Sequence, residues 1–120
     1  MTAMPVLWLL VAAVTLGVTL LVFYIKGIRK PVVIGVHLLF ALGALEQLVI
    51  LLHGAPVGSV IVAGPRGNLA AGLIAAAAFS GLVGGVIAKN GRQTANIAVA
   101  THATLGAAGF LMFLAWMAES

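Results

Sequence analysis

Four long apolar segments take up nearly all of this 120-residue chain, and short polar connections separate them. A helix needs about 20 residues to cross a hydrocarbon core roughly 30 Å thick, at about 1.5 Å per residue. Every segment reaches that length. The sequence therefore predicts an all-α integral membrane four-helix bundle that forms a single domain over residues 1–120. The expected helices cover residues of about 5–25, 31–53, 68–89 and 95–117.

The composition excludes an ordinary soluble fold. Apolar residues make up 63% of the chain and charged residues 7%, whereas about a quarter of the residues in soluble domains are charged. The net charge of +4 does not indicate nucleic-acid binding, because all six basic residues lie between or beside apolar segments and form no common face. The chain has no cysteine, which excludes disulfides, thiolate metal sites and covalent c-type haem attachment.

The basic residues predict the orientation of the bundle. Five of the six lie in the first and last connections, and the longer connection at 54–67 holds only Arg66. Because basic loops stay on the cytoplasmic side, we expect 26–30 and 89–92 to be cytoplasmic and both termini to be outside. The expected location is a bacterial inner (cytoplasmic) membrane. We predict that the connection at 54–67 is a loop folded against the membrane surface or a short hairpin.

The third segment consists largely of small residues. Gly72, Ala76, Ser80 and Gly84 follow one another at four-residue spacing, a pattern that allows membrane helices to approach closely. We interpret it as a packing surface without chemistry. The sequence shows no convincing internal repeat, although each half is expected to be a helical hairpin with a basic turn.

Titratable residues are concentrated in the second segment. It carries His37, Glu46, Gln47 and His53, and the remaining histidine, His102, lies in the fourth segment. Because a titratable group in hydrocarbon costs a few kcal/mol, such residues are functional candidates by default.

His37 and His102 are expected to lie at a common depth. The second and fourth helices run in the same direction, and the histidines follow the last basic residue of the preceding turn by seven and ten positions. Those spacings correspond to depths of roughly 10 and 15 Å, which agree within the uncertainty of the helix starts. Two such imidazoles can face each other across a flat cofactor. The alternatives are a polar contact between helices and a proton or metal path.

Small residues lie on the same helix face as each histidine, at the i+4 and i+7 positions. They would leave a slot in which a macrocycle can lie, with an aromatic ring on each helix to wall it. We therefore predict that His37 and His102 are metal ligands. The remaining predicted cofactor-binding residues are Ala41, Ala44, Gly106, Gly109, Phe40 and Phe110.

With these two histidines and four spans, the chain resembles the small bis-histidine membrane cytochromes b of the b561-like kind. The resemblance implies that neutral imidazoles ligate one haem b axially within the bundle. It covers the architecture of the whole chain and includes no signature string. Members of that family commonly carry two haems, but only His53 remains here, so a second bis-histidine haem is not expected. The implied function is electron transfer with the quinone pool or as an accessory subunit of a larger redox complex.

Glu46 lies nine residues after His37, about half a turn away around the helix, so it points away from the predicted haem face. With Gln47 and His53 it forms a polar strip. One interpretation is a quinone-headgroup or proton site. The other is a neutral Glu46 that hydrogen-bonds to a neighbouring helix or subunit, with His53 at the membrane interface.

Two other functions compete with the cytochrome. Ala98-x-x-x-His102 is similar to the spacing around chlorophyll ligands in light-harvesting helices, which favours a pigment-binding or structural subunit with a chlorophyll-type tetrapyrrole. A small proton-coupled transporter, with no cofactor, would use Glu46 and the histidines as a proton path. The expected partners are the lipid bilayer, a membrane redox partner subunit and quinone, and not nucleic acid.

Overall fold

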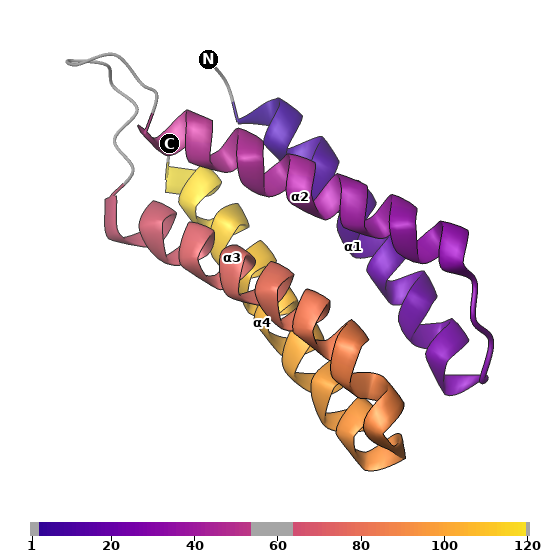
Figure 1. Ribbon diagram of the computed structural model, residues 1–120. Helices are drawn as coiled ribbons and strands as arrows, with labels where there is room; N and C mark the ends of the chain where they lie inside the picture. Colours follow the sequence, from indigo (N-terminus) through magenta and orange to yellow (C-terminus); the bar gives the residue numbers. More distant parts are fainter. Residues whose placement is uncertain (1–2, 54–63, 120) are drawn as a thin grey trace.

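The computed structural model describes residues 3–53 and 64–119, which form an elongated bundle of 51 × 22 × 21 Å (Figure 1). The described part is all-α, as the sequence predicts. Each apolar segment forms one helix, and the two helices of each half are antiparallel. The helices are α1 (Met4–Ile25), α2 (Pro31–His53), α3 (Gly64–Ile87) and α4 (Arg92–Glu119), with a short 3-10 turn, η1 (Ala88–Asn90), between the last two.

Two helix starts lie earlier than expected. Helix α3 begins at Gly64 rather than about 68, since proline at the second position, Pro65, needs no backbone N–H partner in a first helical turn. Helix α4 begins at Arg92, directly after Gly91, whose φ of 135° ends the preceding turn. Residues 64–67, the last part of the predicted loop or hairpin at 54–67, therefore belong to α3. The rest of that prediction, 54–63, lies outside the described residues.

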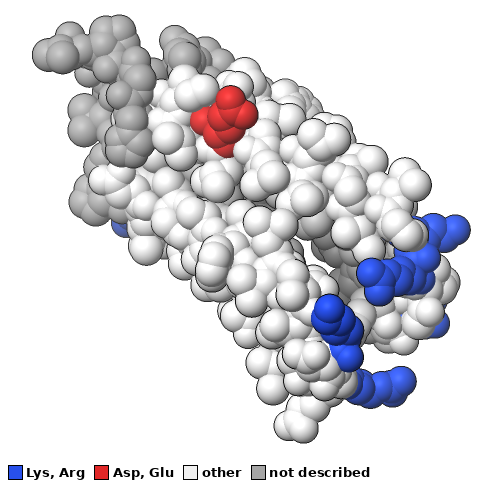
Figure 2. Space-filling view, in the orientation of Figure 1, with Lys and Arg blue, Asp and Glu red and all other residues white. Residues whose placement is uncertain are grey.

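All four helices are long and apolar enough to cross a membrane. Large apolar side chains cover their outer surfaces: Val32 is 78% exposed, Leu39 74% and Phe79 69%. Such a surface is compatible with a lipid environment, where exposed apolar side chains carry no penalty. Apart from Arg66, the Lys and Arg side chains gather where the two short turns lie (Figure 2). We call this the turn end, residues 26–30 and 88–91, and the opposite end the terminal end.

The helices are arranged as a ring in chain order. Helix α1 packs on α2 and α4, and α3 packs on α4 and α2. Across the diagonals, no described Cα atom of α2 lies within 8 Å of one in α4, and the same holds for α1 and α3. The centre of the ring is therefore spanned by side chains alone.

The buried apolar side chains cluster near the terminal end. We call this cluster the terminal core. It is closed, with Phe113, Leu48 and Ala44 fully buried. In the first hairpin the packing opens toward the turn end, since no described residue between positions 14 and 43 is buried, whereas Gly84 and Ala95 of the second hairpin are buried there. The terminal core comprises Val6, Leu10, Ala44, Leu48, Leu51, Leu52, Ala70, Ile74, Phe113 and Trp116.

The two hairpins place equivalent residues 64 or 65 positions apart. Gly27 and Gly91 both have positive φ and lie in the two turns. The chain is thus a repeat of one helical hairpin in the order and spacing of its buried positions. Since the paired residues are seldom identical, the sequence alone does not reveal this repeat. Buried pairs at this spacing are Val6 and Ala70, Leu10 and Ile74, Ala13 and Ala77, Ala44 and Gly109, Leu48 and Phe113, and Leu51 and Trp116.

Candidate functional site

His37 and His102 meet at the centre of the bundle. They come from α2 and α4, the two diagonal helices whose backbones do not approach each other. Their ring centroids are 6.0 Å apart and their ring planes are nearly perpendicular, at 86°. Both side chains are partly buried. They occupy equivalent positions in the repeat, 65 residues apart.

Each histidine is held by a backbone carbonyl of the other helix in its own hairpin. The Nδ1 atom of His37 lies 2.8 Å from the Ala13 carbonyl oxygen. The Nδ1 atom of His102 lies 2.7 Å from the Ala77 carbonyl oxygen. A carbonyl can only accept a hydrogen bond, so in a neutral imidazole Nδ1 carries the proton and Nε2 keeps its lone pair. Both rings therefore offer an unprotonated nitrogen as a possible metal ligand.

A glycine lies against each imidazole. A Cβ atom added to Gly17 would be 3.2 Å from Cε1 of His37. A Cβ atom added to Gly81 would be 2.8 Å from Cε1 and 2.9 Å from Nδ1 of His102. Each glycine follows by four residues the alanine of its helix whose carbonyl accepts the histidine hydrogen bond, Ala13 or Ala77, so both groups lie on the same helix face.

The donor set fits a metal held axially by two imidazoles. Metal–imidazole nitrogen bonds are about 2 Å long, which puts the centroids of two imidazoles that share a metal roughly 6 Å apart. The observed separation is 6.0 Å. Metal-ligating histidines almost always donate their other ring N–H to a carbonyl, carboxylate or water, as both histidines do here. No group of three or more His, Cys, Asp or Glu side chains that could hold a metal ion occurs among the described residues.

The small residues that the sequence assigns to a macrocycle slot are occupied by helix packing. Ala44 is fully buried in the terminal core. A Cβ atom on Gly109 would be 2.9 Å from Cγ1 of Ile74, and one on Gly106 would be 3.9 Å from Cβ of Ala77. Both glycines of α4 thus face α3. Their contact with a cofactor stays a prediction.

The other predicted wall residues are partly buried. Phe110 packs on the edge of the terminal core, and Phe40 and Ala41 are partly buried on α2. The more open side of the pair faces the turn end. In Figure 2 the surface is hollowed there, beside the basic residues.

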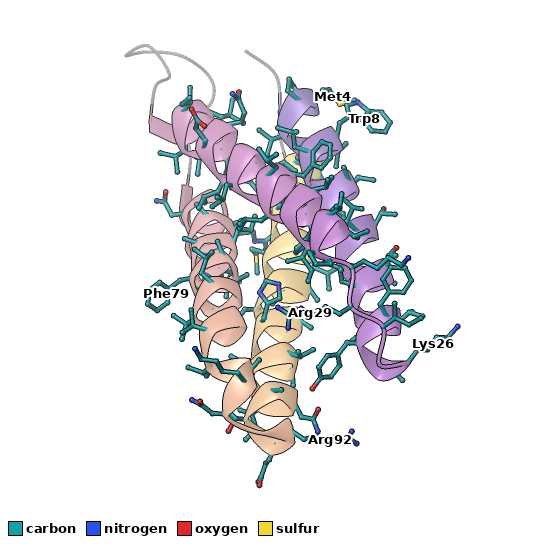
Figure 3. All side chains as sticks on the ribbon, turned by 45° about the vertical axis from the view of Figure 1, so that its right-hand side comes forward. Met4, Trp8, Lys26, Arg29, Phe79 and Arg92 are labelled. Carbon is teal, nitrogen blue, oxygen red and sulfur yellow. The ribbon has the colours of Figure 1, made fainter. Side chains whose placement is uncertain are left out.

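Cations and one bond between hairpins characterise the turn end. The Tyr24 hydroxyl of α1 donates a hydrogen bond to Oδ1 of Asn96 in α4. Figure 3 shows Arg29 at the divide between the hairpins, whereas Lys26 and Arg92 point outward. None of these three cations forms an ion pair within the described part of the chain. The ion pair that does occur among the described residues joins Arg66 and Glu119, at the terminal end.

The predicted polar strip is not part of the histidine site. Glu46 and Gln47 are exposed on the outer surface of α2, and neither forms a hydrogen bond with another described residue. The backbone of His53 ends α2, but its side chain lies outside the described part. The orientation of Glu46 agrees with its placement half a turn from His37.

Sequence reasoning missed the partners of the histidines, which are Ala13, Gly17, Ala77 and Gly81. The available signal was Ala-x-x-x-Gly in the first helix of each half, followed at a similar distance by a histidine. A weak pattern of this kind is hidden in a chain with 15 glycines. It becomes informative once the two hairpins are known to be equivalent.

A shallow groove of about 320 Å³ lies between α3 and α4 on the outer surface. Its walls include Phe79, Val83, Ile87 and Ile97, and it contains neither histidine. Its surface is apolar and faces the surroundings of the bundle, so a lipid chain suits it better than a polar substrate.

No protein-family model, curated protein or solved structure matches this chain. The functional assignment therefore depends on the histidine pair and on the residues that hold it.

Proposed function

We propose that this chain is an integral membrane electron-transfer protein that holds one b-type haem between α2 and α4. The observation that carries the proposal is the histidine pair, with ring centroids 6.0 Å apart and each Nδ1 engaged by a backbone carbonyl. His37 and His102 would hold the haem iron through their Nε2 atoms. A bound haem supplies one-electron redox chemistry to the site.

The chain's own residues bind and orient the group. The Ala13 and Ala77 carbonyls accept hydrogen bonds from Nδ1–H, which fixes the rotation and the tautomer of each ring. The terminal core closes one side of the site and excludes water there. The cations of the turn end would attract the anionic substituents of a bound haem, because these cations lie in or near a low-dielectric region. Of the three cations labelled in Figure 3, Arg29 is the one that lies at the divide between the hairpins.

The pair favours haem over two independent pigments. A chlorophyll-type pigment takes one axial ligand, and two such macrocycles do not fit between imidazoles whose centroids are 6.0 Å apart. One macrocycle held from both faces uses both histidines.

The proposed orientation places 26–30 and 89–92 on the cytoplasmic side of the membrane. It follows from the clustering of cations at one end of the bundle.

Quinone is the proposed redox partner. Glu46 and Gln47 are exposed on α2, on the surface that lipid would cover. A quinone diffusing in the bilayer can therefore reach them directly. Glu46 would exchange the proton that accompanies quinone chemistry. A partner subunit that covers the same surface would use the same residues.

The test is an absorption spectrum with pyridine haemochrome analysis of protein produced with haem supplied. We expect one b-type haem per chain. His37→Ala and His102→Ala should each remove the six-coordinate spectrum and lower haem content at least about tenfold, since one axial bond is lost. His53→Ala is the matched control and should keep the spectrum. A chain without haem, or two absorbers lost independently, would overturn the proposal.

The quinone step has its own test. Glu46→Gln should slow reduction of the haem by a quinol at least about tenfold and leave the haem spectrum unchanged. Glu119→Gln is the control, because Glu119 is the other acidic residue of the chain. Equal reduction rates in both variants would remove Glu46 from the proposal. Proton-coupled flux into liposomes by haem-free protein would support the transporter instead.

A further inference from the structure

Each hairpin contains the same three-part arrangement around its histidine. The first helix presents an alanine carbonyl and, four residues later, a glycine, and the second helix supplies the imidazole. The alanines and glycines of the two hairpins are 64 positions apart and the histidines 65. An arrangement repeated in both halves, when most residues around it differ, indicates a requirement of the site rather than of local packing.

We propose that Gly17 and Gly81 are positioning residues. Each holds the facing imidazole in the rotation and Nδ1–H tautomer that direct Nε2 toward the space between the hairpins. The carbonyl selects the protonated nitrogen, and the glycine allows the ring to lie flat enough on the first helix to reach that carbonyl. The tautomer does not depend on a cofactor, but the effect on a bound haem rests on the proposed function.

The contact distances support this role. The nearest approach to a Cβ atom on Gly81 is an imidazole atom at 2.8 Å, with Nδ1 itself at 2.9 Å. The ring of His102 must therefore shift if any side chain is added at Gly81. The shift moves Nδ1, the atom that hydrogen-bonds to the Ala77 carbonyl. At Gly17 the nearest atom is Cε1 at 3.2 Å, and Nδ1 is 3.7 Å away. A methyl group there displaces His37 only by a few tenths of an ångström.

Two other glycines of the bundle provide a contrast. A Cβ atom on Gly85, one turn beyond Gly81 in α3, meets nothing within 4 Å, and the same holds for Gly43 in α2. Helix propensity changes equally at all of these positions when glycine becomes alanine. Only Gly17 and Gly81 combine that change with displacement of a histidine. Gly85→Ala and Gly43→Ala are therefore matched controls.

The experiment is ¹⁵N NMR of the imidazole nitrogens in haem-free, ¹⁵N-histidine-labelled protein in lipid nanodiscs. The unmodified chain should show His37 and His102 as Nδ1–H tautomers. In Gly81→Ala the tautomer ratio of His102 should fall about tenfold, as expected for loss of one hydrogen bond of ordinary strength. His37 should keep its signals. Gly17→Ala should shift the His37 signals by a smaller amount and leave His102 unchanged.

Several outcomes would overturn the inference. One is Nδ1–H signals in Gly81→Ala that match those of Gly85→Ala. Another is Nε2–H tautomers in the unmodified chain. If Gly81→Ala does not fold, Gly17→Ala decides the question, because its milder contact allows the hairpin to form. An unchanged His37 in that variant would then refute the positioning role.

Haem-loaded protein gives an independent readout. The midpoint potential and the low-spin EPR signals report the strength and the relative rotation of the axial imidazoles. Both should change in Gly81→Ala more than in Gly17→Ala, and neither should change in Gly85→Ala. A chain that binds no haem fails the proposed function but leaves the NMR test valid. If the chain binds haem but the histidine signals are unchanged in Gly81→Ala, only the positioning role is refuted.

Discussion

The two hairpins build the same histidine half-site with different kinds of helix contact. In the second hairpin, glycines press on the neighbouring helix: a Cβ atom on Gly109 would lie 3.1 Å from the backbone nitrogen of Ile74, and one on Gly84 would lie 3.2 Å from Cβ of Ala98. In the first hairpin, Gly35 and Gly43 meet nothing within 4 Å. Contact there is made by larger side chains, such as Leu10 and Leu48.

This difference shows which parts of the repeat are needed at the site. Close backbone approach occurs in one hairpin only, so the half-site does not require it. The carbonyl, the glycine facing the ring and the histidine occur in both. The second hairpin gains its stability from van der Waals contact between backbones, the main attraction available to helices in lipid. The first should be the more tolerant of substitution.

The largest expected difference between the hairpins is at Gly109. Gly109→Ala should lower the free energy of unfolding by about 1 to 3 kcal/mol, because the added methyl meets backbone and has no room to move. Gly43→Ala in the first hairpin should cost nothing and can gain up to about 1 kcal/mol of helix propensity. Unfolding in mixed SDS and dodecyl maltoside micelles measures both. Equal effects would mean that the hairpins pack alike.

A smaller effect is expected at Gly84. Gly84→Ala brings two methyl groups to 3.2 Å, which costs on the order of 1 kcal/mol in the same unfolding measurement. The double variant Gly84→Ala with Ala98→Gly moves the methyl to the other helix and should recover most of that loss. No recovery would show that the strain lies elsewhere, and that this pair does not set the spacing of α3 and α4.

The bond between the hairpins should contribute less again. Tyr24→Phe removes the hydrogen bond to Asn96 and should destabilise the bundle by about 0.6 kcal/mol, the average for such bonds between membrane helices. The variant keeps the ring and so its packing. A loss above about 2 kcal/mol would show that the turn end, rather than the terminal core, holds the hairpins together.

The smallest effect is expected at Arg66 and Glu119. Their side chains are 56% and 51% exposed, so water and salt screen the ion pair. Arg66→Gln should change stability by less than about 0.5 kcal/mol at physiological salt. Glu119→Gln should match it. A clear loss in one variant alone would indicate a further partner for the residue that was changed.

Apolar segment length was sufficient to predict the four helices, and helix geometry was sufficient to bring His37 and His102 to one level. Both follow from local rules, the rise per residue and the hydrophobic thickness. The roles of Ala44 and Gly109 could not be predicted in this way. The sequence pattern of small residues is the same whether they face a cofactor or a neighbouring helix. In the structure, Gly109 faces Ile74.

The repeat was hidden for a related reason. Membrane packing selects for side-chain size at each contact, so Leu48 and Phe113 can occupy equivalent buried positions without any likeness in sequence. The sequence could not predict which backbone carbonyls bind the histidines either, because every residue carries a carbonyl. Only the placement of α1 against α2, and of α3 against α4, shows which carbonyl each ring meets.

The unit that repeats has an even number of helices, and this even number bears on how two copies of it can be joined. A two-span hairpin returns to the side from which it started, so a second copy fused in tandem enters the membrane in the same orientation as the first. Its histidine then arrives at the same depth without any change of loop charges. A gene for one hairpin, paired with itself, would already place two equivalent rings face to face, and fusion frees the copies to diverge, as at Glu46 and its counterpart Leu111.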